Sequence, residues 1–274
     1  MPLIDAPVVE VTYVGGPTAI VNIDGFYFIT DPTFDAAGGE YKVGAISLHK
    51  LKDPGLDRAA LPRLDAALVS HDQHPDNLDN SGRELIRTVP NVFTTRIGAE
   101  RLGGNVVGLA PWDERVIKTP AGKRLKITAT PARHGPVGIE KLSGDVVGFV
   151  VTSLDTGEDL IYVTGDTVWY EGTQEVANRF NPRVVILFAG GALTARGPFY
   201  LTMNTNDAAT AAMKFSDSAI VPVHHEGWAH FSQSQDDLVK TFTALGIAPR
   251  LSAVRAGVTL KIPPREKALR RAQG

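Results

Sequence analysis

The sequence predicts an α/β fold in which two β-sheets face each other and helices cover the outer side of each sheet. Short apolar runs bounded by glycine, proline or polar clusters indicate strands in both halves of the chain, and helical segments follow them. Stacking in layers lets each of these elements bury its apolar face. Polar loops that contain histidine or aspartate directly follow four of the strands, so we expect a functional site at the strand ends.

The first strands are expected to be antiparallel and joined by tight turns. They are the segments 8–14, 18–23 and 26–30. Pro32 then ends the pairing, because proline cannot donate to a sheet. Residues 35–62 show no clear period and are predicted to form a long irregular loop. The cations within it, at 49–52, either meet an anionic substrate or form ordinary surface.

The apolar run 66–69 predicts a buried strand that leads directly into the polar stretch 70–79. Ser81 is followed three residues later by Glu84, a capping-box pattern, so a helix is expected to begin there. The rest of the chain continues this alternation of strands and helices. Further strands are predicted at 92–95, 116–117, 125–130, 146–153, 159–164, 184–188, 219–223 and 258–262, and further helices at 97–102, 206–215 and 233–245.

The composition limits the class of protein. With 274 residues, 43% of them hydrophobic, the chain can bury a sizeable core, and we expect a single domain over 1–274 with a flexible tail at 262–274. A net charge of −2 gives no electrostatic support for a nucleic-acid partner. The sequence has no cysteine, which excludes disulfides, thiolate metal sites and a cysteine nucleophile.

Nothing in the sequence indicates a membrane partner. No apolar run approaches the ~20 residues that a membrane-spanning helix needs, and the amino terminus lacks the pattern of a secretory signal. We therefore expect a cytoplasmic protein, although a mature exported chain would share these features. The expected partner is a small-molecule substrate, and an anionic substrate is one option. The sequence does not decide whether the protein forms a homo-oligomer.

Side chains suited to binding metal follow four predicted strands. They are His71, His74 and Asp76 after the first, then His134, then Asp166, and His224 after the last. Strand ends of layered α/β folds converge on one rim, so these groups are expected to meet there. Histidines with two carboxylates form a ligand set for one or two Zn²⁺, Mn²⁺ or iron ions, and an aspartate between two ions can bridge them.

The order of these motifs resembles the metallo-β-lactamase superfamily. That family has a histidine-rich motif after a strand, a later lone histidine, a Gly-Asp-Thr turn like 165–167 here, and a final strand that ends in histidine. The segments 12–18, 30–32 and 222–228 look like its branch of L-ascorbate-6-phosphate lactonase-like hydrolases. The resemblance covers the chain from Tyr13 to about Phe231. It implies a four-layer αββα sandwich of two mixed sheets and a metal-dependent hydrolase.

One part of the motif departs from the family pattern, which reads His-x-His-x-Asp-His. Here either Gln73 replaces the second histidine, or one residue is inserted and His74 takes that role. The insertion is preferred, because His74 and Asp76 then align with the second half of the motif. The last histidine of the motif would still be Asn77, a weaker ligand, so a mononuclear or asymmetric site is an alternative to two ions.

The expected chemistry follows from the metal. A bound Zn²⁺ or Mn²⁺ lowers the pKa of its water toward ~7, and the resulting hydroxide attacks an ester, lactone or related bond of a small polar substrate. Asp76 is the candidate to orient the nucleophile, and His225 or His230 could protonate the leaving group. His230 could equally serve in packing. The alternatives are a phosphodiesterase or phospholipase D-like hydrolase, a non-catalytic metal-binding protein, and an iron oxidoreductase.

Overall fold

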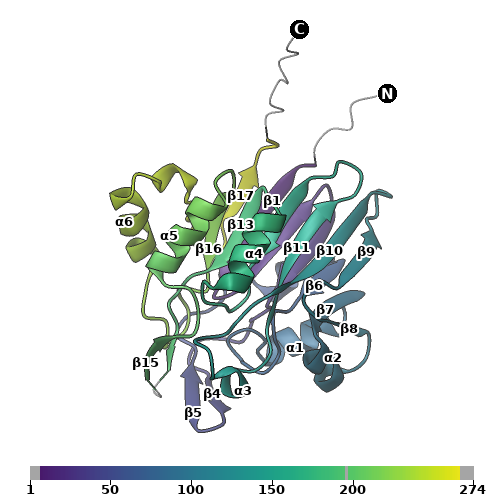
Figure 1. The fold of residues 1–274 in the computed structure, drawn as a ribbon. Helices are drawn as coiled ribbons and strands as arrows, with labels where there is room; N and C mark the ends of the chain where they lie inside the picture. Colours follow the sequence, from purple (N-terminus) through teal and green to yellow (C-terminus); the bar gives the residue numbers. More distant parts are fainter. Residues whose placement is uncertain (1–6, 195–196, 266–274) are drawn as a thin grey trace.

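The computed structural model describes residues 7–194 and 197–265, and it confirms the predicted αββα architecture (Figure 1). Two sheets face each other, and their inner sides form one continuous apolar core. That core includes Val11, Phe28, Phe149 and Phe188, which are all buried. Alternating apolar side chains of both sheets meet in this layer, as expected for two sheets packed face to face.

The first sheet has seven strands in the order β17, β1, β2, β3, β6, β7, β8. In that order they span Thr259–Ile262, Val9–Gly15, Thr18–Ile23, Phe26–Thr30, Ala66–Leu68, Asn91–Thr95 and Val106–Leu109. The strands from β17 to β3 are antiparallel, whereas β3, β6, β7 and β8 run parallel. The closing strand, predicted at 258–262, thus pairs with the first strand of the chain.

The second sheet has six strands in the order β16, β13, β12, β11, β10, β9. In that order they span Ala219–Val223, Val184–Phe188, Asp159–Val163, Val147–Ser153, Arg124–Pro131 and Glu114–Lys118. Strands β12, β13 and β16 run parallel, and the others are antiparallel. Both sheets are therefore mixed, and the parallel strands of each end on the same edge.

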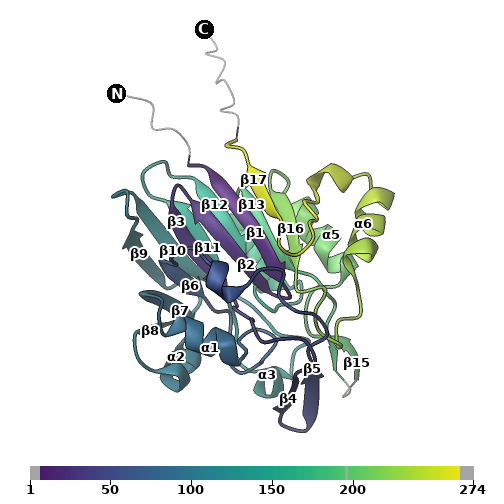
Figure 2. The ribbon, with the colours of Figure 1, turned by 180° about the vertical axis from the view of Figure 1, so that it is seen from behind.

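Helices cover the outer sides of the sheets (Figures 1 and 2). The second sheet packs on α4 (Glu171–Arg179), α5 (Thr205–Lys214) and α6 (Gln235–Ala244). The first sheet packs on α1 (Asn80–Ile86), α2 (Arg96–Leu102) and the loop that holds η1 (Arg58–Ala60). A short 3₁₀ turn, η2 (Ala248–Arg250), follows α6. No helix among the described residues is long and apolar enough to cross a membrane.

Small elements at the lower end of the molecule surround the strand ends (Figure 1). One hairpin consists of β4 (Glu40–Val43) and β5 (Ile46–His49), and another of β14 (Leu193–Thr194) and β15 (Gly197–Tyr200). The helix α3 (Glu140–Ser143) lies nearby. The first hairpin corrects the prediction that 35–62 is irregular. Its side chains are half-buried or exposed apart from Leu48, so it has no apolar stripe to reveal it.

Two further predictions are corrected by the structure. The helix α1 begins at Asn80, and Asp79 rather than Ser81 caps it, because Oδ1 of Asp79 accepts the backbone N–H of Gly82 at 2.8 Å. The Ser81 hydroxyl instead donates to Asp35. The predicted flexible tail at 262–274 also begins too early, since Ile262 is a buried residue of β17. Its residues 266–274 lie outside the described part of the chain.

Candidate metal centre

The four predicted groups of ligands come together at one edge of the sandwich. They lie in the loops that follow β6, β10, β12 and β16, whose last residues are Leu68, Pro131, Val163 and Val223. Gly165 allows one of these loops to approach another closely, since it has a φ of 62° and any side chain there would meet Ser70. The convergence of strand ends therefore brings together residues that are far apart in the sequence.

Three histidines form the first cluster. Nδ1 of His74 lies 2.9 Å from Nε2 of His71 and 3.1 Å from Nε2 of His134. All three ligand atoms lie within 4.8 Å of one another. Burial lowers the pKa of His71 well below its usual range and lowers the pKa of His74 and of His134 to about 4. The three imidazoles are therefore neutral at pH 7, which is the form that binds a metal ion.

A hydrogen-bonded chain orients His71 from behind. The Ser70 hydroxyl donates to Oδ1 of Asp31 at 2.9 Å, so its oxygen is left to accept the Nδ1–H of His71, also at 2.9 Å. The Ser70 backbone N–H donates to the same oxygen of Asp31 at 2.7 Å. This chain places the proton of His71 on Nδ1 and leaves the lone pair of Nε2 directed at the cluster.

A backbone carbonyl fixes the tautomer of His134 in the same way. Nδ1 of His134 lies 2.9 Å from the carbonyl oxygen of Leu201, which can only accept, so Nδ1 carries the proton. Nε2 of His134 and Nε2 of His71 are thus both unprotonated. The single nitrogen of His74 between them can donate to one of them at most. A cation bound by these three nitrogens would satisfy all three lone pairs.

Two carboxylates and a histidine form the second cluster, from Asp76, Asp166 and His224. Nε2 of His224 lies 3.3 Å from Oδ2 of Asp76 and 3.4 Å from Oδ1 of Asp166. All three residues are buried. Burial opposes ionisation of Asp76, but the nearby His230 and His224 hold its pKa well below its usual range. Burial raises the pKa of Asp166.

Several buried polar atoms of the second cluster have no hydrogen-bond partner. They are Oδ1 of Asp76 and both ring nitrogens of His224. A buried polar atom without a partner costs about 1–3 kcal/mol, and an ion bound in this cluster would supply the missing partners. Oxygen and imidazole nitrogen ligands suit Zn²⁺ and Mn²⁺. The donor set of both clusters therefore fits divalent metal ions.

Asp166 belongs to the second cluster and also faces the first. Its Oδ2 lies 3.4 Å from Nε2 of His134 in the first cluster, while its Oδ1 faces His224 in the second. The amide of Asn77 donates to Oδ1 of Asp166 at 3.2 Å and so fixes the direction of the carboxylate. This position is the one that a bridging aspartate needs in a two-metal site.

The structure places His74, and not Gln73, at the second position of the histidine motif. The Gln73 amide instead donates to the carbonyl groups of Ser143 and Asp145 on the outside of the site. Asp72 also points away, because Arg101 pairs with its carboxylate. The loop therefore has the arrangement that a one-residue insertion requires.

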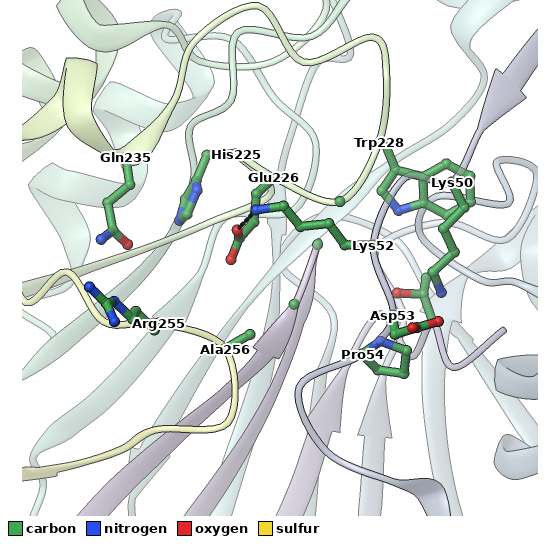
Figure 3. A pocket seen from close by; sticks show the side chains of 14 residues that line it. Lys50, Lys52, Asp53, Pro54, His225, Glu226, Trp228, Gln235, Arg255 and Ala256 are labelled. Atoms are coloured by element: carbon green, nitrogen blue, oxygen red, sulfur yellow. Dashed lines mark hydrogen bonds and ion pairs between the residues drawn. The ribbon is translucent and has the colours of Figure 1, made fainter. Parts of the chain in front are cut away.

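His225 and His230, the two candidates for protonating a leaving group, have different surroundings. Nε2 of His230 lies 2.9 Å from Oδ2 of Asp76. His225 is not brought to the clusters. Its ring packs on Tyr13, with 5.5 Å between ring centroids, and lines a second cavity of about 410 Å³ on the other side of the loop (Figure 3). The two neighbours His224 and His225 diverge because His224 has a φ of 59°.

The cations of the segment 49–52 do not reach the clusters. Lys50 is buried and paired with Asp79 at 3.0 Å, and Lys52 is paired with Glu226 at 2.6 Å. Figure 3 shows the Lys52–Glu226 pair in the second cavity, and no residue of either cluster lines that cavity. The option that this segment meets an anionic substrate at the metal centre is therefore not supported by its position.

A cavity of about 300 Å³ opens directly onto the clusters, and His74, Asp76, His134, Asp166 and His230 lie on its floor. Its walls are largely apolar. They come from the two small hairpins and α3, with Val43, Ile46, Leu48, Ile139, Leu142, Leu193, Phe199 and Leu201. The described part of this wall contains no lysine or arginine.

Sequence reasoning missed both this wall and the role of Asp31. The residues of the wall lie in segments without a readable period, so no sequence signal identified them. Asp31 carries a weak signal, because an aspartate directly after a strand and before a proline is poorly explained by packing. Its φ of 32° is uncommon for a residue other than glycine.

Comparison with known proteins places this chain in a family. Residues 27–225 match the family described as Beta-lactamase superfamily domain. An uncharacterized protein of Mycobacterium tuberculosis is 27% identical over 237 residues, which is 83% of this chain and 60% of that protein. A UPF0173 metal-dependent hydrolase of Caldivirga maquilingensis is 27% identical over 210 residues, covering 74% of this chain and 82% of the relative.

The fold also matches solved structures. The crystal structure of isothiocyanate hydrolase from Delia radicum gut bacteria superposes with a TM-score of 0.76 at 23% identity. The match covers 92% of this chain and 98% of that one. The present chain spans only about 60% of the length of the mycobacterial relative, so the two proteins are not equivalent along their whole length.

Proposed function

This chain belongs to the family described as Beta-lactamase superfamily domain, and on that basis we propose that it is a metal-dependent hydrolase. Its proposed reaction is the attack of water on an ester, lactone or related bond of a small molecule. The observation that supports this most is the convergence of His71, His74 and His134, two of which have tautomers fixed for binding a cation. The lactone option rests on the resemblance of the motifs to lactonase-like hydrolases.

The proposed cofactor is one or two divalent ions, either Zn²⁺ or Mn²⁺. The first site would be held by His71, His74 and His134, and the second by Asp76, Asp166 and His224. When bound, such an ion supplies a Lewis acid that lowers the pKa of a water molecule toward ~7 and polarises the bond to be cleaved.

The side chains of this protein have defined tasks around that chemistry. Asp76 lines the cavity and has one oxygen, Oδ1, without a hydrogen-bond partner, so this oxygen can accept a hydrogen bond from a water and orient it. Asp166 separates the clusters and holds them at a fixed spacing. We assign no proton transfer to His225, since it lines the other cavity.

The cavity wall supports a substrate with an apolar substituent. Side chains such as Leu48, Leu142 and Phe199 remove apolar surface from water when a ligand binds. The described residues of the wall include no lysine or arginine, so the charge of a phosphodiester would have to be balanced by the proposed metal ions alone, and we therefore prefer a neutral carbonyl compound to the phosphodiesterase alternative. This proposal replaces the polar substrate expected from the sequence with a more apolar one.

A substrate panel tests this proposal. Purified protein loaded with Zn²⁺ or Mn²⁺ is assayed on chromogenic esters, lactones and phosphodiesters that carry either short polar or apolar substituents. An aryl isothiocyanate is added because the solved structure above is named for that activity. Turnover is expected to be higher for apolar carbonyl substrates than for phosphodiesters.

His134→Ala is expected to lower that turnover by at least about tenfold, as removal of a metal ligand does. His225→Ala serves as the matched control, because it removes a buried histidine of the same region that lines the other cavity. Bound metal without turnover on any member of the panel would instead favour the non-catalytic metal-binding alternative.

A further inference from the structure

We propose that His230 provides the second metal site with the imidazole that Asn77 cannot supply. This inference rests on the proposed metal centre and goes beyond it, because it assigns a ligand from a different segment of the chain. The family pattern places a histidine at the position of Asn77, directly after the motif aspartate. Here an imidazole reaches that aspartate from the loop after β16 instead.

The contacts of Asn77 leave it unable to act as a good ligand. Its amide nitrogen donates to Oδ1 of Asp166 at 3.2 Å, and its own Oδ1 is buried without a partner. An amide oxygen is also a weaker ligand for Zn²⁺ than an imidazole nitrogen. Asn77 therefore orients Asp166 but leaves the second site one strong donor short.

His230 reaches the second site through its contact with Asp76. Its Nε2 lies 2.9 Å from Oδ2 of Asp76, and Nε2 of His224 lies 3.3 Å from the same oxygen. Ligand atoms that sit about 2.0–2.2 Å from a common Zn²⁺ ion lie roughly 3–3.5 Å apart in a tetrahedral arrangement. The spacings of both histidines from Asp76 are close to this range, whereas the ring centroids of His224 and His230 lie 6.5 Å apart, so the His230 ring would have to turn toward the ion to bind it. The side chain of His230 is only 17% exposed, and its Nδ1 has no hydrogen-bond partner.

The backbone around His230 is held on two sides, which gives the imidazole a defined position. Its carbonyl accepts the N–H of Leu193 at 3.0 Å, next to the bridge between Ala192 and Phe231. The neighbouring Ala229 donates to the carbonyl of His49 at 3.0 Å. A ligand on a fixed backbone needs little reorganisation to bind an ion.

A hydrogen bond alone could also explain why His230 contacts Asp76. Under that alternative His230 is a positioning residue, and the second site has only Asp76, Asp166 and His224. Substitution by glutamine separates the two roles. The amide of glutamine can still donate to Asp76, but it is a poor ligand for Zn²⁺.

The test counts metal ions and uses Zn²⁺ alone as the probe. Metal-free protein is titrated with Zn²⁺ against a chromophoric chelator, and the zinc content after dialysis is measured by elemental analysis. The wild type is expected to bind two equivalents. His230→Gln is expected to keep one tight equivalent and to bind the second at least tenfold more weakly. His225→Gln, at the adjacent buried histidine of the other cavity, is expected to keep two.

A double variant tests whether a histidine at position 77 can replace the imidazole of His230. The double variant Asn77→His with His230→Gln returns the imidazole to the position of the family pattern, and it is expected to bind two equivalents again. Circular dichroism and the thermal midpoint confirm that each variant is folded, and His230→Asn replaces His230→Gln if the latter is not.

The outcomes separate this inference from the proposed function. Two equivalents at unchanged affinity in His230→Gln, or a loss that Asn77→His does not restore, would overturn the inference. A wild type that binds a single equivalent would also overturn it, while leaving a mononuclear hydrolase intact. A wild type that binds no divalent metal would overturn the proposed function itself.

Discussion

Nζ of Lys50 lies 3.0 Å from Oδ2 of Asp79, and both side chains are buried. The other oxygen of Asp79 accepts the N–H of Gly82 and caps α1. The same carboxylate therefore begins the helix behind the metal loop and holds the base of the β4–β5 hairpin. Charges buried in this way stabilise a fold only as long as both partners are present.

Lys50→Met is expected to lower the free energy of unfolding by about 3–5 kcal/mol, because it leaves the buried Asp79 without its positively charged partner. Urea denaturation measures the change. Lys52→Met is the control, since the side chain of Lys52 is 62% exposed and surface ion pairs contribute ~0–1 kcal/mol. Equal losses of unfolding free energy in the two variants would show that the buried Lys50–Asp79 pair stabilises the fold no more than the exposed Lys52–Glu226 pair does.

Asp31→Ala is expected to weaken Zn²⁺ binding by about 10–100-fold, because the Ser70 hydroxyl loses its acceptor and no longer fixes the tautomer of His71. Burial raises the pKa of Asp31 well above its usual range. Asp31→Asn resembles the protonated carboxyl and keeps an oxygen acceptor, so it should bind zinc nearly as the wild type does. Zinc titration against a chelator compares them, and similar losses in both variants would argue against this role.

Asp166→Ala is expected to lower metal content or activity by at least about tenfold, because Asp166 faces both clusters. A role at both sites predicts weaker binding of each zinc equivalent, which competition titration resolves. Asp72→Ala offers a comparison at a carboxylate that Arg101 turns away from the centre. An unchanged zinc content and rate in Asp166→Ala would remove this residue from the site.

The metal-free protein is expected to lose stability as the pH falls from about 6.5 to about 4. Burial holds the pKa of His134 at about 4, whereas an unfolded histidine titrates near ~6.5. In that interval the unfolded chain binds more protons at His134, so the free energy of unfolding decreases by at most ~1.4 kcal/mol per pH unit from this residue. In chelator-treated His134→Gln, the free energy of unfolding measured by denaturation should therefore depend less steeply on pH than in the metal-free wild type. An identical slope in the two proteins would contradict this prediction.

The strands that carry the site could be predicted because their signals are local. The apolar runs at 66–69, 184–188 and 219–223 are short, almost entirely buried and followed at once by polar or glycine-containing loops, so the sequence predicts their ends to within a residue or two. The polar helix α4 was missed for the opposite reason. Only Thr173 and Val176 of this helix are buried, so it has no apolar stripe to detect.

The details of the centre depend on backbone directions that a sequence pattern does not contain. Whether His224 or His225 faces the clusters is decided by the left-handed conformation of His224. This conformation is supported by Gly190, where any side chain would collide with the His224 carbonyl. The sequence likewise showed that either Gln73 or His74 fills one position, but only the folded loop distinguishes them.

The walls of the metal cavity come from elements that supply none of the clustered ligands. The β4–β5 hairpin contributes Val43, Ile46 and Leu48, and two backbone hydrogen bonds tie the residues at its base to Gly227 and Ala229. The cavity wall and the clustered ligands therefore come from separate parts of the chain. Exchange of the hairpin segment 40–48 is therefore expected to change which substrates fit the cavity, while it leaves the clustered ligand residues and the Ala229–His49 hydrogen bond in place.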